Sequence, residues 1–566
     1  MKRWAWAALL SVLVLGVVVR FLPLGRFVVW GSDTGEYAVL TSRLLESGTI
    51  VLGYNGWGFG YPYFPGMFLL TGATQMLAGI PAFDALLWVT PVAGALSVMM
   101  IALIAFRAFG DIRAGLVAGG FLAVNTPSAF STSHAMPGTL GDMLALMCIL
   151  LLLKALEKRA ALVALVFSTM ALVMTHHLST FFVLMPVLLA LLVRELLRVK
   201  WDVARTRVEG GYAVFLLSVT LLFWYAYAVP FRERVIPEGF NTSPWVMLVL
   251  AYLALLLIPG LVLLRRRLSP TGMYRPVFPS FRRVAIMYAL FIAVGVSILA
   301  GTALLTMPGT NINVDDRAAY WFTPQLLLIG ISMAGSAWAE YSREGMFIWA
   351  WLGALTAIFL LGAATNNHVL IPYRMTQYII EPLAVFAGAG AIFLHDQWNG
   401  KGDRRKAVAL GSAIAVTFLL SAATAYPPRE IIGGFEEGTD ADEMDSVHWL
   451  RTGEGNAELL ATDHRMSSIV WGYAGINTSW DDAKLTLHGD LEEARGEMSG
   501  LQTPTGFHRV VLVLLDPTIE SGVALEQWES AMPLVGAAKE KFSDPLFIKE
   551  YEANGVVIYR VDGALL

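Results

Sequence analysis

Residues 64–80, with the sequence FPGMFLLTGATQMLAGI, decide how this chain is threaded through a membrane. The stretch is apolar, but it is short for a membrane-spanning helix, which needs about 20 residues. It follows residues 54–63, a segment rich in glycine and aromatic side chains. Whether residues 64–80 cross the bilayer or lie along its surface sets the side on which every later loop emerges.

The composition requires a lipid environment for most of the chain. Of 566 residues, 56% are hydrophobic and 15% are charged, whereas about a quarter of the residues in a soluble protein are charged. We therefore expect a polytopic α-helical membrane protein with about 13 transmembrane helices. The apolar runs that predict them are 4–24, 86–106, 114–129, 140–156, 160–174, 178–193, 212–230, 245–264, 284–307, 320–339, 345–364, 375–394 and 407–425.

The distribution of Lys and Arg then decides the topology. If residues 64–80 do not cross, most basic residues of the first 425 fall on the same side as Lys2 and Arg3, as the positive-inside rule requires of the cytoplasm. If they cross, the basic loops face outward. We therefore predict an interfacial or re-entrant helix at 64–80, a cytoplasmic N-terminus and an external C-terminus in a multi-pass protein of the cell membrane.

Two domains follow from this topology. Residues 1–425 form the transmembrane domain, with a long first external loop at 25–84, and residues 426–566 form a soluble, acidic, extracytoplasmic α/β domain. In the latter, the patterns predict strands at 458–462 and 509–515, a helix at 525–542, and a hairpin of 547–551 with 556–561 that turns near Asn554-Gly555. The single cysteine, Cys148, lies in an apolar run and offers no disulfide framework.

Two carboxylates stand directly after the first helix, in Gly31-Ser32-Asp33-Thr34-Gly35-Glu36-Tyr37. A helix that begins here would present Asp33 and Glu36 on one face. The spacing also suits a capping box, with Asp33 as the N-cap and Glu36 closing it. We favour a functional pair because it lies where the membrane meets the external medium.

Other polar residues that the topology places on the external side are candidates for the same cavity. The charged cluster Asp315-Asp316-Arg317 is also typical of an ordinary solvated loop. His176 and His177 are adjacent in a helix and point in different directions, so they are poor joint ligands of one metal. Arg374 stands at a membrane edge, where a guanidinium suits a lipid phosphate. The cavity candidates are His134, Asp142, His176, His177, Asp316 and Arg317.

The segment Pro372-Tyr373-Arg374-Met375-Thr376-Gln377-Tyr378, with Pro382, resembles the R-F-T-x-Y…P segment of the oligosaccharyltransferase catalytic subunit. The chain is thus similar to the GT-C superfamily of glycosyltransferases, which use polyprenyl-phosphate-linked sugars and have an acidic residue in the first external loop, where Asp33 falls. The W-W-D-Y-G acceptor motif of that subunit is absent, and Ala461-Thr462-Asp463-His464-Arg465 stands in its place.

The resemblance implies a lipid-linked-sugar-dependent glycosyltransferase that moves a sugar or glycan from a polyprenyl (for example dolichyl) phosphate or pyrophosphate carrier to a protein, lipid or glycan acceptor. Asp33 is then the general base or a metal ligand, Glu36 supports it, and Arg374 with Tyr373 binds the lipid phosphate. A divalent cation, Mg or Mn, would have Asp33, His134 and Asp142 as candidate ligands.

No P-loop or G-x-G-x-x-G segment follows a strand, so we expect no nucleotide cofactor, and we expect no nucleic acid partner. Membrane lipid is the expected surroundings. Two other functions stay open. One is a membrane transporter or lipid flippase, for which paired broken helices and charges at mid-membrane would be typical. The other is a noncatalytic membrane scaffold whose external domain binds partners.

Overall fold

The computed structural model describes most of the chain, in ranges separated by gaps. These are residues 3–49, 54–155, 157–196, 203–240, 243–246, 248–249, 286, 289–290, 292–293, 297, 315, 317–339, 342, 344–365, 372–400, 402–453, 458–503, 506–523 and 531–566. The predicted spans 245–264 and 284–307 fall almost entirely outside the described residues, as does Asp316.

Helices form the larger part of the structure. Most of the remaining predicted apolar runs lie in a single helix, but 114–129 is divided at Asn125 and 212–230 extends past a helix end at Ala226. The bounds of the helices are α1 Arg3–Phe21, α2 Thr34–Ser47, α3 Gly66–Ala78, α4 Ala82–Phe109, α5 Ile112–Val124, α6 Thr126–Ser131, α7 Pro137–Ala155, α8 Arg159–Thr175, α9 His177–Leu196, α10 Val203–Ala226, α11 Val229–Phe240, α14 Ala318–Ala339, α15 Gly345–Thr365, α16 Pro372–Gly400 and α17 Arg404–Ala423.

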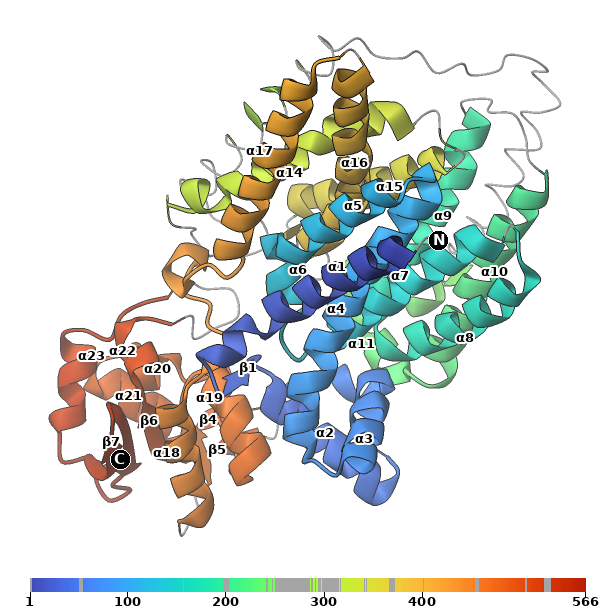
Figure 1. The fold of residues 1–566 in the computed structure, drawn as a ribbon. Helices are drawn as coiled ribbons and strands as arrows, with labels where there is room; N and C mark the ends of the chain where they lie inside the picture. The colour runs from blue at the N-terminus through green and yellow to red at the C-terminus, as the bar shows by residue number, and fades with distance from the viewer. Residues whose placement is uncertain are drawn as a thin grey trace.

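In the described part of the chain, 8 helices are long and apolar enough to cross a membrane, and α3, α5 and α8 are shorter apolar helices. This is the architecture of a multi-pass membrane protein. Helix α16 is its central element: 78% of its apolar window is buried, against 11% for α17. Helix α16 packs on α14, α5, α15 and α4. Figure 1 shows these helices gathered into one bundle.

Small residues allow the central helices to approach closely. Gly335 on α14 and Gly390 on α16 lie against each other, and a Cβ at either position would overlap the backbone of the partner helix. Close approach of backbones is how membrane helices gain packing energy, because lipid supplies no hydrophobic force between them. The crossing thus holds α16, which begins two residues before Arg374, in place.

Helix α3, which lies within residues 64–80, is too short to span a membrane. With 13 residues and a rise of about 1.5 Å per residue, α3 is roughly 20 Å long, against about 30 Å of hydrocarbon. It packs on α2, α4 and α8, with Met76 and Leu77 exposed. Figure 1 shows α2 and α3 at the end of the bundle that carries the C-terminal part of the chain. This geometry agrees with an interfacial helix.

The C-terminal part, from residue 426, contains a sheet of four strands in the order β3-β6-β8-β7. Its strands are β3 Leu459–Ala461, β6 Val510–Leu515, β7 Phe547–Ala553 and β8 Val556–Val561, and the short strands β4 Leu501–Thr503 and β5 Gly506–His508 pair separately. Its helices are α18 Ala441–Thr452, α19 His464–Ile469, the π-helix η4 Val470–Ala474, α20 Lys484–His488, α21 Leu491–Met498, α22 Pro517–Ser521 and α23 Ala537–Glu540.

The predicted hairpin is present, since β7 and β8 pair antiparallel and Asn554 and Gly555 both have positive φ, of 50° and 86°. The helix predicted over residues 525–542 is wrong at 531–536, and the described residues after them form only short helical turns. Within the described residues of this range, α23 and the 3-10 helix η5, Lys541–Ser543, are helical, whereas Met532 forms an antiparallel bridge with Val523 and Gly536 has φ 58°. A bridge and a left-handed residue both interrupt a helix.

The C-terminal part is joined to the first loop through the backbone. Strand β1, Val29–Trp30, pairs antiparallel with β2, Gly438–Thr439. A second contact lies where α2 meets α19 and η4: a Cβ at Gly35 would overlap the carbonyl of Ser468, and one at Gly472 would overlap the carbonyl of Gly35. The two glycines therefore let backbones touch at the start of α2.

We predict that Gly472→Ala lowers the stability of the protein by about 1–3 kcal/mol, because the added methyl group forces backbone apart in a packed contact. Thermal unfolding of the purified protein in detergent measures this as a lower apparent Tm. Gly496→Ala is the matched control, since a Cβ there meets nothing within 4 Å. An unchanged Tm for Gly472→Ala would show that the contact is not as close as described.

Candidate active site

Asp33 is the centre of a polar cluster at the start of α2. Its Oδ1 lies 2.8 Å from Nε2 of His464, and its Oδ2 accepts hydrogen bonds from the hydroxyls of Tyr37, at 3.0 Å, and Tyr61, at 2.8 Å. Its carboxylate makes no capping bond to α2, so the capping-box interpretation is wrong. The side chain is held by tertiary partners instead and is 20% exposed.

The charge state of the cluster follows from these contacts. Burial alone would raise the pKa of Asp33, but the hydrogen bond and charge of His464 and the two tyrosine hydroxyls bring it below its ordinary value. Burial opposes protonation of His464, yet Asp481 and Asp33 hold its pKa well above the ordinary value. Asp33 is thus an ionised carboxylate beside an imidazolium.

Glu36 lies one turn further along α2 and is fully buried. Its Oε1 accepts hydrogen bonds from the Tyr54 hydroxyl and from the backbone N–H of Gly58, the latter at 3.1 Å. Its Oε2 has no hydrogen-bond partner within the part of the chain that the structure describes. Burial, and next the charge of Asp33, raise the pKa of Glu36 to about 7. Because Glu36 is fully buried, it acts on the site through its charge interaction with Asp33 and not by direct contact with a molecule from outside.

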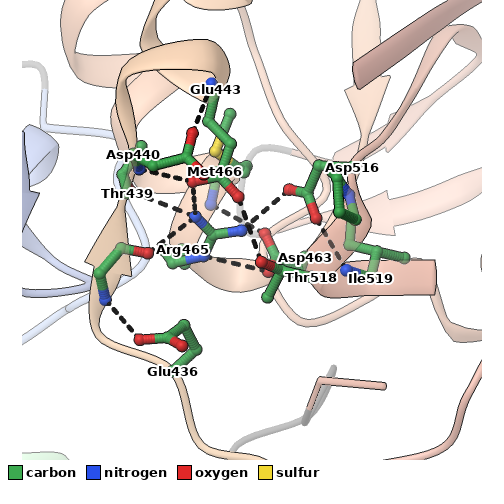
Figure 2. A network of polar contacts seen from close by, with 12 residues as sticks. Glu436, Thr439, Asp440, Glu443, Asp463, Arg465, Met466, Asp516, Thr518 and Ile519 are labelled. Atoms are coloured by element: carbon green, nitrogen blue, oxygen red, sulfur yellow. Dashed lines mark hydrogen bonds and ion pairs between the residues drawn. The ribbon is translucent and has the colours of Figure 1, made fainter. Parts of the chain in front are cut away.

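The short helix α19 positions His464. Asp463 caps it by accepting the N–H of Met466, at 2.9 Å. Figure 2 shows the next residue, Arg465, among the carboxylates of the C-terminal part, where it contacts Glu443 at 2.6 Å and Asp516 at 2.9 Å. A buried arginine between carboxylates is stable only in good geometry, so this network sets the direction in which His464 points.

A second polar cluster lies among the membrane helices. The guanidinium of Arg20, which is buried, donates to Thr132 and Ser128, at 2.8 and 3.1 Å. Its charge also acts on Asp142, and Asp142 shares a hydrogen bond with Glu381 of α16.

This second cluster continues to the membrane edge. The Tyr378 hydroxyl, which interacts electrostatically with Asp142, lies 3.3 Å from Ser179 Oγ, and Ser179 Oγ lies 2.8 Å from His176 Nδ1. The charge of Arg374 acts on His176 in turn. The structure therefore brings together Asp142, His176 and Arg374, but around their own network and apart from the contacts of Asp33.

The remaining predicted residues have other surroundings. His134 donates from Nδ1 to the carbonyl of Phe130, at 3.0 Å, and its Nε2 lies 3.8 Å from Glu437. The His177 ring packs between Phe64 and Phe231. Arg317 is exposed and pairs with Asp315 at 2.7 Å. Asp316 and the side chain of Tyr373 lie outside the described residues.

The candidate metal ligands do not converge. Asp33 is engaged by His464 and two tyrosines, His134 faces Glu437, and Asp142 faces Glu381. Across the described ranges, no three His, Cys, Asp or Glu side chains gather as the ligands of a metal ion would.

Several residues of these clusters were not among the predicted site residues, and they include His464, Glu381 and Asp481. His464 could have been found from the sequence, since it lies in the segment Ala461-Thr462-Asp463-His464-Arg465 that the sequence analysis singled out. Glu381 could have been found too, since it is an acidic residue inside a predicted membrane span. Asp481 had no such signal. It lies 2.7 Å from Nδ1 of His464 and accepts a hydrogen bond from the indole of Trp57, at 2.9 Å.

We predict that Glu36→Gln removes a pH dependence of stability. Because the folded state raises the pKa of Glu36 from 4.5 to about 7, it binds the proton more tightly than the unfolded chain. The parent therefore loses stability, up to about 3 kcal/mol, as pH rises through this window. As pH rises from 4.5 to 7, the apparent Tm of the parent should fall relative to that of Glu36→Gln.

Glu46→Gln, an exposed change on the same helix, is the control and should follow the parent at every pH. A constant difference in Tm between Glu36→Gln and the parent over this range would show that Glu36 is not held in its neutral form.

The comparisons with known proteins find similarity of fold. No protein family and no curated protein matches the sequence. Among solved structures, the archaeal oligosaccharyltransferase AglB from Archaeoglobus fulgidus, in complex with an inhibitory peptide and a dolichol-phosphate, superposes with a TM-score of 0.62 at 13% identity, over 100% of this chain and 75% of that one.

The Archaeoglobus fulgidus oligosaccharyltransferase with Zn and sulfate gives a TM-score of 0.56 at 13% identity, over 98% of this chain and 72% of that one. ArnT from Cupriavidus metallidurans, bound to undecaprenyl phosphate, gives 0.42 at 12% identity, over 100% of this chain and 99% of that one. The fold of the chain is thus similar to that of the archaeal oligosaccharyltransferase, and an identity of 13% establishes the fold alone.

Proposed function

We propose that this protein is an integral membrane glycosyltransferase that moves a sugar or glycan from a polyprenyl-phosphate or pyrophosphate carrier to an acceptor on the extracytoplasmic side. The observation that carries the proposal is Asp33, an ionised and partly exposed carboxylate held by two tyrosines and a histidine beside the membrane bundle. The fold supports it, because a structure of the similar oligosaccharyltransferase contains a dolichol-phosphate.

Asp33 binds and orients the acceptor in this proposal. Its pKa is held low, so it stays ionised and accepts a hydrogen bond from the attacking group. That bond strengthens as the group loses its proton in the transition state. A carboxylate with a low pKa is a weak general base, so orientation and charge are its main contributions. Glu36 supports it from below.

Arg374 binds the phosphate of the lipid carrier. It is exposed at the first turn of α16, at a membrane edge by the predicted topology, and an arginine there suits the oxygens of a phosphate. As the bond between sugar and phosphate breaks, negative charge grows on the phosphate, and a fixed positive charge lowers the energy of that state. The charge of Arg374 acts on His176 and His177.

A transporter is the second candidate, and one observation favours it. Arg20, Asp142 and Glu381 are ionisable groups buried among helices of the bundle, and such groups often mark a path for ions or protons. A flippase that uses this cluster would move a lipid-linked sugar without transferring it. The transfer experiment below separates the two functions.

We predict that the purified protein transfers radiolabelled sugar from at least one member of a panel of polyprenyl-phosphate and pyrophosphate sugars. The panel is offered with a mixture of membrane proteins, lipids and glycans as acceptors. Asp33→Asn and Arg374→Ala should each lower the rate at least about 100-fold, because each removes a charge that acts in the transition state.

Asp84→Asn and Arg404→Ala, at exposed positions, are the matched controls and should keep the parent rate. All variants are compared at equal Tm, so that loss of fold is excluded. Full activity in Asp33→Asn would remove the proposed role of this residue. If no donor in the panel supports sugar transfer, the transferase proposal is contradicted, and the transporter or the scaffold becomes the favoured function.

The proposed sidedness predicts a labelling pattern. A cysteine at Lys549, in the C-terminal part, should react with a membrane-impermeant maleimide in intact cells. A cysteine at Arg404, at the start of α17, should react only after permeabilisation, because basic loops stay in the cytoplasm. The parent is the control, since its single cysteine, Cys148, is buried. The reverse pattern would contradict the topology.

A further inference from the structure

Helix α2 does not cap its own N-terminus. Asp33 stands at the N-cap position, from which a side chain ordinarily accepts the backbone N–H of the third helical residue, here Glu36. Asp33 makes no such bond, and its oxygens face His464 and two tyrosines. The Glu36 side chain does not close a capping box either, because it bonds with Tyr54 and Gly58. The backbone N–H groups at the start of α2 therefore need other acceptors.

Two side chains of the C-terminal part supply these acceptors. The Ser468 hydroxyl accepts the N–H of Glu36, at 3.2 Å, and a carboxylate oxygen of Glu437 accepts the N–H of Ser32, at 2.7 Å. Both side chains are buried, with Ser468 0% and Glu437 5% exposed. Residues that lie 432 and 405 positions from their donors thus take the role of the predicted capping box.

The contact between α2 and α19 has two matched points. His464 and Ser468 lie four residues apart on α19, so they share one face. On α2, Asp33 and Glu36 lie three residues apart. His464 contacts the Asp33 carboxylate, and Ser468 accepts the N–H of Glu36. The backbones are close enough for this because Gly35 has no side chain: a Cβ there would lie 2.1 Å from the Ser468 carbonyl oxygen. One turn of α19 therefore both caps α2 and contacts Asp33.

Glu437 is held by the strand pairing that joins the two parts of the chain. It directly precedes β2, and its carbonyl accepts the N–H of Gly31, at 2.9 Å, beyond the last β1–β2 pair. Its own N–H donates to Glu436, at 3.0 Å. Gly31 has φ 126°, a conformation that favours glycine, where the chain turns from β1 into α2. The side chain of Glu437 thus continues the pairing to Ser32, the residue before Asp33.

We propose that Ser468 and Glu437 are positioning residues: by capping α2 from the C-terminal part, they leave the Asp33 carboxylate turned toward the acceptor. A buried N–H without a hydrogen-bond partner is costly. Without Ser468, the N–H of Glu36 would therefore draw Asp33 into the ordinary N-cap position, and its carboxylate would turn away from His464. The role in sugar transfer rests on the proposed function, whereas the capping of α2 does not.

The first measurement is a cycle of thermal stabilities, which needs no transfer activity. Ser468→Ala is made in the parent, in Asp33→Asn and in Asp33→Ala, each as the full-length protein in detergent. Asp and Asn are good N-caps, whereas Ala is not. The fall in apparent Tm that Ser468→Ala causes should therefore be at least about twice as large in Asp33→Ala as in the other two backgrounds.

Ser446→Ala, at another fully buried serine of the C-terminal part, is the matched control. Its hydroxyl donates to the Glu443 carbonyl and has no contact with α2, so its loss should lower Tm equally in all three backgrounds. If Ser468→Ala also lowers Tm equally in all three, Asp33 does not compete for the N–H of Glu36, and the proposal is overturned.

The second measurement is transfer with the best donor. Ser468→Ala should lower kcat at least about tenfold with little change in the KM for the donor, because a displaced Asp33 no longer orients the attacking group. Glu437→Ala should act in the same way. Glu437→Gln, which keeps an oxygen that can accept the N–H of Ser32, should recover most of the rate lost in Glu437→Ala. A parent kcat in Ser468→Ala, or equal losses in the two Glu437 variants, would overturn the positioning role.

The two measurements keep the failures apart. If no donor supports transfer, the proposed function fails, and the stability cycle still decides whether the C-terminal part caps α2 in place of Asp33. If transfer is present but the cycle shows equal losses, the capping proposal fails and the transferase stands.

Discussion

The contact between Asp33 and His464 joins residues that are 431 positions apart, and the site depends on it. The two parts of the chain meet beside it in the β1–β2 pairing and in the backbone contact at Gly35 and Gly472, where a Cβ would overlap the opposite backbone. A charge removed from water must be paired and hydrogen-bonded, or the desolvation cost exceeds the attraction. Asp33 meets that condition with His464 and two tyrosines. The close backbone contact brings α19 near enough to α2 for His464 to reach Asp33.

The polar groups of this protein are divided between two depths. The Asp33 cluster lies between the bundle and the C-terminal part, whereas Arg20, Asp142 and Glu381 lie among the helices. Polar groups in a low-dielectric interior are costly unless they are hydrogen-bonded. Thr132 and Ser128 accept hydrogen bonds from Arg20, and Ser97 is a partner of Asp142. A chain of contacts through Ser179 and His176 ends beside Arg374, so the inner cluster and the proposed phosphate site share one network.

Different residues determine the fold and the site. This explains how the chain can have a fold similar to that of an oligosaccharyltransferase with which it shares 13% sequence identity. A helical bundle needs apolar runs of sufficient length and small residues where helices cross, such as Gly335 and Gly390, and many sequences meet those needs. A site needs a few specific side chains. In this chain those side chains include Asp33, His464 and Asp481, which lie far apart in the sequence and meet only in the fold.

The sequence by itself determined the membrane-embedded class, most helix positions, the β7–β8 hairpin and the polar segment around Asp33. These follow from local causes: apolar run length, the turn preference of Asn554-Gly555 and the position of charges relative to spans. It failed at residues 531–536, where a bridge to Val523 overrides helical propensity. Only the tertiary structure decided that His464 and Asp481 meet Asp33 and that Glu381 meets Asp142, because a contact across hundreds of residues leaves no spacing pattern in the chain.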